Sequence, residues 1–262
     1  SLEQQGNKVF QIDGLVIAVV GHPYWSDEAG NSPLEDEKGI KRLLHCWQTQ
    51  GVKSLERVTG HFALAIIDNK SQSCHLYSDR MGVCRLYWHE LDGKQGLCFS
   101  STMAGVKRVC KLKHEISPDA LYAYMYFHMI PTPYSIHPKI HKLRPGHVLS
   151  YNNGEMDETL LREVSFSENP QASFSDLKDE LVSLLDQSVG NKTHDPSEVA
   201  SFLSGGIDSS TVTGVMAKQS DSPVGSYSIG FDTQEYDETP FARLTSAHFK
   251  SQHTEYYVTP QD

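Results

Sequence analysis

The sequence lacks the features that mark several protein classes. Its five cysteines, Cys46, Cys74, Cys84, Cys98 and Cys110, are odd in number and form no CxxC pair, which argues against a disulfide framework and a structural zinc site. No apolar run is long enough to cross a bilayer, and no basic stretch followed by an apolar segment opens the chain. We therefore expect reduced thiols, no membrane partner and a cytoplasmic location.

Blocks of basic residues are also missing. The 33 acidic residues outnumber the 23 basic ones, both kinds are interspersed, and the formal net charge is -10. Because a nucleic-acid surface needs a basic track to face the phosphates, we expect no nucleic-acid partner. The 262 residues, with 38% hydrophobic content, can bury one large core or two modest ones, and two domains are the better expectation.

The first half of the chain, residues 9–165, has the pattern of short strands with few helices. A helix is predicted where apolar side chains recur at helical spacing from Ile40 to Trp47, and Gly51 is placed to end it. A second helix is expected to begin at Ser117, which offers a capping hydroxyl and is followed by proline. A hairpin is predicted around a polar turn at 69–72. The predicted strands are 15–20, 60–68, 73–79, 97–101 and 146–151.

The second half changes its rhythm after a polar stretch without periodicity. We place an interdomain linker at residues 166–173, and Ser173 with Asp176 has the pattern of a capping box that opens a helix. Strands then alternate with helices, which is typical of a parallel, doubly wound sheet. The predicted elements are a helix from 174 to about 189, a strand at 199–203, a helix at 210–218, a strand at 224–229, a helix at 237–249 and a strand near 256–258.

One segment, residues 201–210, combines an apolar strand, a glycine turn and a helix that opens with hydroxyl residues. Gly205 and Gly206 lack Cβ atoms, so N–H groups can converge on an anion at the positive end of the helix dipole. Asp208 could hold the Mg²⁺ that accompanies a nucleotide. The lysine of a Walker loop is absent. An ordinary strand-to-helix connection that contains two glycines remains the alternative.

The sequence Ser-Gly-Gly-Ile-Asp-Ser at 204–209 resembles the SGGxDS loop of enzymes that split ATP into AMP and pyrophosphate. Other segments are similar to glutamine-dependent asparagine synthetases, in the same order and at similar spacing. Their collinear succession extends the resemblance over nearly the whole chain. These segments are 60–68, 79–82, 86–87, 99–101, 133–134 and 143–147 in the first half, and 226–231, 236–244, His253 and 258–262 in the second.

The resemblance implies a fold class and a domain division. Residues 3–165 would form an α+β glutaminase domain of the Ntn-hydrolase type, a layered antiparallel β sandwich with helices. Residues 174–262 would form the first part of an α/β ATP-pyrophosphatase domain with a doubly wound parallel sheet. A homodimer is compatible with the resemblance, which leaves the oligomeric state open.

The resemblance also implies a reaction and its site. The family adenylates a carboxylate, which would be aspartate or an analogue, and ammonia or an amine then attacks the acyl-adenylate. ATP and Mg²⁺ are the expected cofactors. Leu203 and Ile229 would frame the adenine and ribose, and Asp208 would hold the metal. The residues expected to hold pyrophosphate and Mg²⁺ are Ser204, Gly205, Gly206, Asp208 and Ser209.

The first half departs from the family pattern at its glutamine pocket. Val20 and His22, on either side of Gly21, stand where relatives carry the Asn and Glu that contact glutamine, and Gly39 stands where an acidic residue is expected. The chain also begins without the N-terminal cysteine nucleophile of the family. We therefore expect no catalytic residue in this half and interpret it as a silent structural domain.

Other interpretations of the whole protein stay open. Relatives carry a second, SGEGxDE-type loop and a lysine beyond the position of Asp262, so this chain alone is not expected to form an amide. The protein could be a lactam-forming synthetase that uses an internal amine, or a non-catalytic scaffold or regulatory pseudoenzyme. An intact nucleotide loop beside an altered glutamine pocket favours an enzyme.

Two groups of side chains are interpreted as structural rather than as ligands. His137 and His141 are separated by Pro138, which breaks the helix that would bring them together, so solvated loop histidines are favoured over metal ligands. An aromatic run is expected to serve helix packing and domain contact. Its members are Tyr122, Tyr124, Tyr126 and Phe127.

Overall fold

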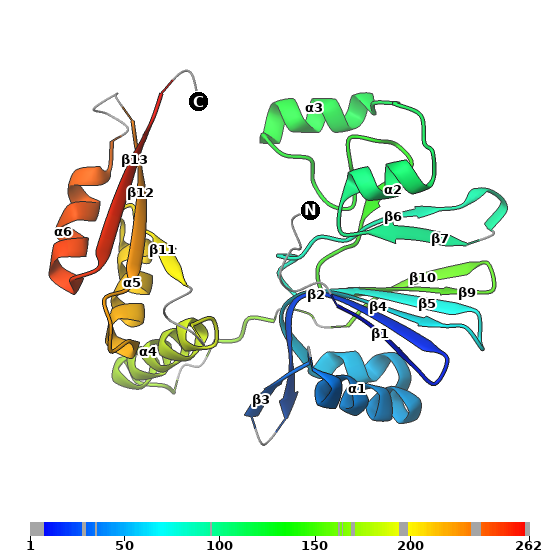
Figure 1. Ribbon diagram of the computed structural model, residues 1–262, viewed down its shortest axis with the longest axis horizontal. Coiled ribbons are helices and arrows are strands. Elements are labelled where there is room, and N and C mark those ends of the chain that lie inside the picture. Colours follow the sequence, from blue (N-terminus) through cyan, green and yellow to red (C-terminus); the bar gives the residue numbers. More distant parts are fainter. Residues whose placement is uncertain are drawn as a thin grey trace. The chain divides into compact units, whose positions relative to one another are not determined.

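The computed structural model divides the chain into two compact units, Ser1–Phe166 and Ser167–Asp262 (Figure 1). The division lies at the start of the predicted linker, 166–173. No helix among the described residues combines the length and the apolar character that a membrane span requires. The residues that the structure describes are 8–27, 30–34, 36–94, 96–161, 163, 165–168, 171–193, 199–231 and 237–259.

The first unit contains a large antiparallel sheet in the order β1-β2-β4-β5-β9-β10, with β3 paired to the end of β2. Strands β2 and β4 pair from Leu15 opposite Asp68 to Trp25 opposite Val58. The predicted hairpin is confirmed, because β4 pairs with β5 across the turn at 69–72. The strands are β1 (Lys8–Ile12), β2 (Leu15–Asp27), β3 (Gly30–Pro33), β4 (Val58–Asp68), β5 (Ser73–Ser78), β9 (His147–Asn152) and β10 (Glu155–Leu160).

A second antiparallel sheet of three short strands, in the order β7-β6-β8, completes the β structure described in this unit. The mixture of antiparallel sheets and helices agrees with the predicted α+β class. Sequence patterns had indicated β7 but not the other two strands, nor the helix α2. The elements are β6 (Tyr87–Glu90), β7 (Leu97–Ser100), β8 (His141–Lys142), α2 (Met103–Val109) and two 3₁₀ segments, η1 (Gly51–Arg57) and η2 (Asp92–Lys94).

The large sheet separates two apolar cores, because successive side chains of a strand point to opposite faces. The first core lies against α1 (Glu37–Gln50), whose Ile40 is fully buried, and includes Leu64 of β4. The next residue on β4, Ala65, belongs to the second core. Helix α1 ends as predicted at Gly51, whose φ of +56° lies in the left-handed region. Each β2 side chain therefore points toward one of these two cores, according to its position along the strand.

Helix α3 (Pro118–Phe127) begins as predicted, because the Ser117 hydroxyl accepts a hydrogen bond from the Ala120 N–H at 3.2 Å. Ala120 is the buried residue of this helix, whereas its aromatic side chains are more than half exposed. The prediction of helix packing for the aromatic run was therefore wrong, and domain contact stays a prediction. The exposed fractions are Tyr122 74%, Tyr124 52%, Tyr126 69% and Phe127 57%.

The second unit contains a parallel sheet in the order β11-β12-β13, as the alternation of strands and helices predicts. The predicted capping box is present, since the side chains of Ser173 and Asp176 each accept from the other residue's N–H. The elements are α4 (Phe174–Gly190), β11 (Ala200–Phe202), α5 (Ile207–Gln219), β12 (Gly225–Phe231), α6 (Thr239–Phe249) and β13 (Gln252–Val258).

Within the second unit, the described residues cover one face of this parallel sheet and leave the other partly exposed. On β12, Ser226 and Ser228 are buried, whereas Tyr227 is 49% and Ile229 50% exposed. A doubly wound sheet carries helices on both faces, and the described residues cover only one face of β12. The parallel pairing is therefore observed, and the doubly wound arrangement stays a prediction.

Candidate functional site

The SGGIDS segment lies where β11 ends and α5 begins. Leu203, which is 1% exposed, precedes it and is anchored to the neighbouring strand. Its N–H donates to the Tyr227 carbonyl at 2.8 Å, and its own carbonyl accepts from the Ser228 hydroxyl. The segment therefore leaves the carboxyl end of a parallel strand, which is where open α/β sheets bind ligands.

Two glycines shape the turn between strand and helix. Gly205 has a φ of +84°, and a Cβ there would meet the Cβ of Phe241 at 2.4 Å and the Ala242 nitrogen at 2.6 Å. Gly206 is the N-cap of α5, and no side chain caps the helix. The first N–H groups of α5 thus lack a side-chain acceptor, while the backbone of the loop can approach a ligand closely.

The serines of the segment bind one another. The hydroxyls of Ser204 and Ser209 lie 3.0 Å apart, and the Ser204 N–H donates to the Ser209 oxygen at 3.2 Å. The Gly206 N–H donates to the Ser204 hydroxyl at 3.3 Å. These bonds close the loop on itself and place two hydroxyls and the helix N-terminus next to each other. That arrangement suits the oxygens of a phosphate group.

A cavity of about 280 Å³ adjoins the segment. Four predicted residues line it, namely Leu203, Ser204, Ser209 and Ile229. Gly205, Gly206 and Asp208 do not line it; they form the loop and the first turn of α5. The sequence analysis missed the other lining residues. They are Phe202, Tyr227, Ser228, Glu238 and Thr239.

A signal for one missed residue was present in the sequence. Tyr227 lies two positions before Ile229, and residues two apart on a strand share a face. Glu238 had no such signal, because it lies beyond β12 at the N-cap of α6 and reaches the cavity only through the fold. The cavity therefore has an apolar wall on β12 and a carboxylate that the sequence did not assign.

Asp208, the predicted Mg²⁺ ligand, lies exposed in the first turn of α5. No group of three or more His, Cys, Asp or Glu side chains that could hold a metal occurs in the described part of the chain. Mg²⁺ bound with a nucleotide typically takes one or two carboxylates and completes its shell with phosphate oxygens and water. An exposed aspartate beside the loop fits that kind of site.

Three of the residues predicted at the place of the glutamine pocket, Val20, Gly21 and His22, lie on β2. Gly21, with a φ of +84°, is pressed against its neighbours: a Cβ would meet the His61 carbonyl oxygen at 2.3 Å and the Cys84 sulfur at 2.8 Å. Val20 packs against the second core of the large sheet. His22 is exposed on the same strand. Val20 therefore has an apolar packing role in this fold. Replacing it with asparagine would remove its buried methyl groups and place a polar amide against the core.

Gly39 lies apart from these residues. It is buried on α1, where a Cβ would meet the Pro33 carbonyl oxygen at 2.4 Å. Helix α1 packs on the first core, and Val20 on the second, so the two residues lie on opposite faces of the large sheet. The structure does not bring Gly39 together with Val20, and its small size is explained by helix packing.

His137 and His141 belong to no group of three or more possible metal-binding side chains among the described residues. His137 lies with Nδ1 2.6 Å from the Glu115 carbonyl oxygen. His141 belongs to β8, is half-buried, and its ring lies 4.7 Å from that of Trp88. Burial, followed by the charge of His89, lowers the pKa of His141. The expectation of a solvated loop residue was therefore wrong for His141.

Comparison with known proteins places both units. Residues 36–161 match the model of the glutamine amidotransferase domain, and residues 180–262 match that of asparagine synthase. Over 238 residues the chain is 33% identical to the putative asparagine synthetase [glutamine-hydrolyzing] 2 of Methanocaldococcus jannaschii, covering 87% of this chain and 45% of that protein. The chain belongs to the glutamine-dependent asparagine synthetase family.

Another member of the family, asparagine synthetase [glutamine-hydrolyzing] 1 of Bacillus subtilis, is 24% identical over 236 residues, which are 90% of this chain and 37% of that protein. The chain thus spans less than half the length of these relatives. A solved glutamine phosphoribosylpyrophosphate amidotransferase from B. subtilis, complexed with ADP and GMP, aligns with 97% of this chain and 48% of that chain at 13% identity. The TM-score of this alignment is 0.35.

Proposed function

We propose that this protein is an ATP-dependent carbon–nitrogen ligase of the asparagine synthetase type. In the proposed reaction a carboxylate oxygen, of aspartate or an analogue, attacks the α-phosphorus of ATP and pyrophosphate leaves. Ammonia or an amine then attacks the acyl carbon, and AMP leaves. The observation that carries the proposal is the glycine turn at Gly205, pressed against Phe241 and opening a helix that no side chain caps.

In this proposal the chain's own residues bind and orient the nucleotide. The hydroxyls of Ser204 and Ser209, with the first N–H groups of α5, hold the pyrophosphate oxygens and stabilise the charge that develops on the leaving group. Leu203 and Ile229 contact the adenine and ribose from the wall of the 280 Å³ cavity. Asp208 holds Mg²⁺, which neutralises negative charge on the phosphates when it is bound.

We further propose that the first unit does not hydrolyse glutamine. The family's glutaminase pocket needs polar side chains that contact glutamine. At the corresponding positions this chain has Val20, which packs against an apolar core, and His22. The unit would then serve as a structural domain, and the nitrogen would come from free ammonia or an amine.

Pyrophosphate–ATP exchange tests the ligase proposal. The intact gene product, supplied with aspartate and Mg²⁺, is expected to exchange radiolabelled pyrophosphate into ATP, and Asp208→Asn is expected to lower the exchange at least a hundredfold. Asp221→Asn serves as the matched control, because Asp221 is an exposed aspartate beyond the end of α5. Exchange that survives Asp208→Asn unchanged would remove the loop from the mechanism. Nucleotide binding without exchange for any carboxylate would favour a non-catalytic scaffold.

A further inference from the structure

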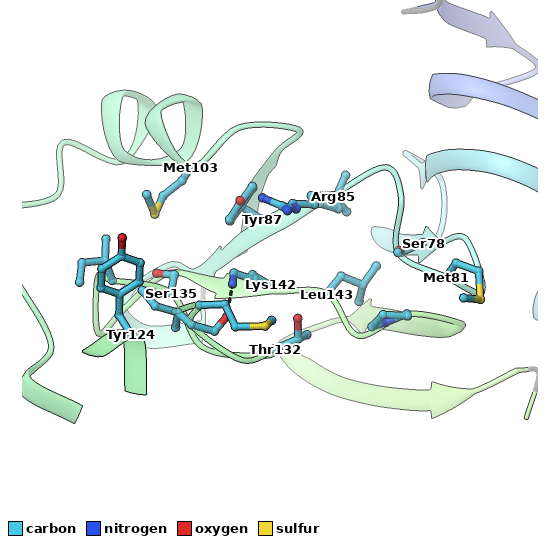
Figure 2. A pocket seen from close by; sticks show the side chains of 16 residues that line it. Ser78, Met81, Arg85, Tyr87, Met103, Tyr124, Thr132, Ser135, Lys142 and Leu143 are labelled. Carbon is cyan, nitrogen blue, oxygen red and sulfur yellow. Dashed lines mark hydrogen bonds between the residues drawn. The ribbon is translucent and has the colours of Figure 1, made fainter. Parts of the chain in front are cut away.

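The first unit holds a cavity of about 460 Å³ that the proposed function does not use (Figure 2). It lies among the loop after β5, the strand β6, helix α3 and the segment that leads into β8. Figure 2 shows Lys142 in its middle and Arg85 beside Tyr87, with Tyr124 toward one end and Met81 toward the other. A volume of this size is in the range of small-molecule sites.

The charges in this cavity are all of one sign. Arg85 and Lys142 both line it, and no acidic side chain does among the lining residues that the structure describes. The Lys142 ammonium donates to the Ile130 carbonyl at 2.6 Å, which uses one of its three protons. Burial, and then the positive charge of Arg85, lowers the pKa of Lys142. The two cations are thus close enough to repel each other inside the same cavity.

The remaining lining of the cavity is a mixture of apolar and hydroxyl side chains. Met103 and Leu143 contribute apolar surface, while Thr132, Ser135 and Tyr87 contribute hydroxyls. Binding sites for small molecules combine mostly apolar walls with a few polar groups that orient the ligand. An inorganic ion would leave the apolar walls of this cavity without a partner.

We propose that this cavity binds a small organic anion, with its carboxylate or phosphate group held between Arg85 and Lys142 and its apolar part against Met103. Arg85 is an exposed residue, and a guanidinium offers a planar fork of N–H groups that matches either anion. Lys142 supplies a second charge from a position that its bond to Ile130 fixes. A bound anion relieves the repulsion between the two cations. This cavity belongs to the first unit, whereas the SGGIDS loop belongs to the second, and the proposal does not depend on the proposed ligase reaction.

Calorimetric titration of the chain with three probes tests the proposal. The probes are hexanoate, hexyl phosphate and hexanamide, which share an apolar tail and differ in the charge of the head group. We expect at least one of the two anions to bind at least ten times more tightly than neutral hexanamide. The tighter of the two anions identifies the natural head group as a carboxylate or a phosphate.

Variants assign any binding to the cavity. Arg85→Gln is expected to weaken binding of the tighter anion at least tenfold, and Arg85→Lys to restore part of the loss. Arg108→Gln is the matched control, because Arg108 is an exposed arginine of α2 outside the cavity. This variant is expected to bind the anion as tightly as the unmodified chain does. Because Arg85 is exposed, these changes should leave the fold intact, which an NMR fingerprint spectrum checks. Equal binding by Arg85→Gln and the unmodified chain, or equal affinity for hexanamide and the anions, would overturn the proposal.

Discussion

The backbone of Gly205 lies directly against Phe241: a Cβ at position 205 would come within 2.4 Å of the Phe241 Cβ. The two residues are far apart in the sequence, one in the loop before α5 and the other in the first half of α6. Their contact sets how closely the loop before α5 can approach helix α6. Helix α6 therefore supports the turn that presents the N-terminus of α5.

This contact predicts a large loss of stability on substitution of one of the two adjacent glycines and a small loss for the other. Gly205→Ala should lower the free energy of unfolding of the second unit by about 2 to 5 kcal/mol, because it adds strain at positive φ and overpacks the contact with α6. Gly206→Ala is the matched control: its φ is -68°, and a Cβ would lie 3.3 Å from the Ser204 hydroxyl. It should cost less than about 1 kcal/mol. Hydrogen exchange of amides in α5 and α6 measures the loss of stability in each variant. Similar losses in the two variants would mean that the contact between Gly205 and Phe241 does not stabilise the unit.

The buried carboxylate of Asp79 organises the loop after β5. It is 1% exposed and accepts hydrogen bonds from four backbone N–H groups, at 2.9 to 3.2 Å. Asp79→Asn replaces one accepting oxygen by an amide NH₂ and leaves N–H groups without an acceptor. We expect a loss of about 2 to 5 kcal/mol in the free energy of unfolding of the first unit. The donors are Phe62, Met81, Val83 and Cys84.

Tryptophan fluorescence during urea unfolding measures this loss selectively, because all three tryptophans, Trp25, Trp47 and Trp88, lie in the first unit. Asp13→Asn is a suitable control. Asp13 is exposed in a turn with φ of +53°, a conformation that asparagine tolerates. If Asp79→Asn unfolds at the same urea concentration as Asp13→Asn, the four hydrogen bonds do not hold the loop.

Glutamine hydrolysis should be absent, even in a variant that carries a cysteine at the mature N-terminus. A thiol at that position is not sufficient, because Val20 and His22 offer neither the amide nor the carboxylate that would hold glutamine. The double change Val20→Asn and His22→Glu should tighten glutamine binding at least a hundredfold, since hydrogen bonds to the charged groups of glutamine contribute about 1.5 to 3 kcal/mol each.

Glutamate release and glutamine titration check this prediction, with His22→Gln, which adds no charge, as the control. Val20→Asn will also cost stability, because Val20 packs in the second core. Robust glutamate release that depends on the added cysteine, with Val20 and His22 unchanged, would show that the first unit still has a working glutamine pocket.

Removing the charge of Arg85 should raise the pKa of Lys142. In the fold this pKa is lowered by burial and by Arg85, so the folded state binds fewer protons than the unfolded state between the folded and unfolded pKa values. The free energy of unfolding therefore rises with pH between the folded and unfolded pKa values of Lys142. Arg85→Gln should narrow that pH range. An NMR titration of the Lys142 Cε signal measures the pKa, with Arg108→Gln for comparison. An unchanged pKa in Arg85→Gln would mean that the two cations do not interact.

Local signals predicted much of the secondary structure. Ser117 and Ser173 begin helices and Gly51 ends one, because a capping hydroxyl or a left-handed φ is required by the backbone at that position alone. The hairpin at 69–72 was equally predictable, since its strands are adjacent in the chain. Strand β8, with two residues, carries no periodicity of its own and forms only because β6 lies beside it.

Exposure and distant contacts could not be predicted in this way. The aromatic residues of α3 have a composition typical of a core, yet which of them are covered depends on elements elsewhere in the chain. Gly39 was assigned to a glutamine pocket by its place in the sequence, whereas its burial beside Pro33 shows a packing role on the other face of the sheet from Val20.

The sequence by itself determined the family and located the SGGIDS loop, because this segment is continuous and its shape depends on local backbone geometry. Only the tertiary structure decided which side chains join that loop from elsewhere, such as Glu238, and which surround the second cavity. Arg85 and Lys142 are separated by more than fifty residues, and nothing in either local pattern marks them as a pair. They face one cavity because pairing of β6 with β8 brings their segments together, and such pairing depends on packing across the whole unit.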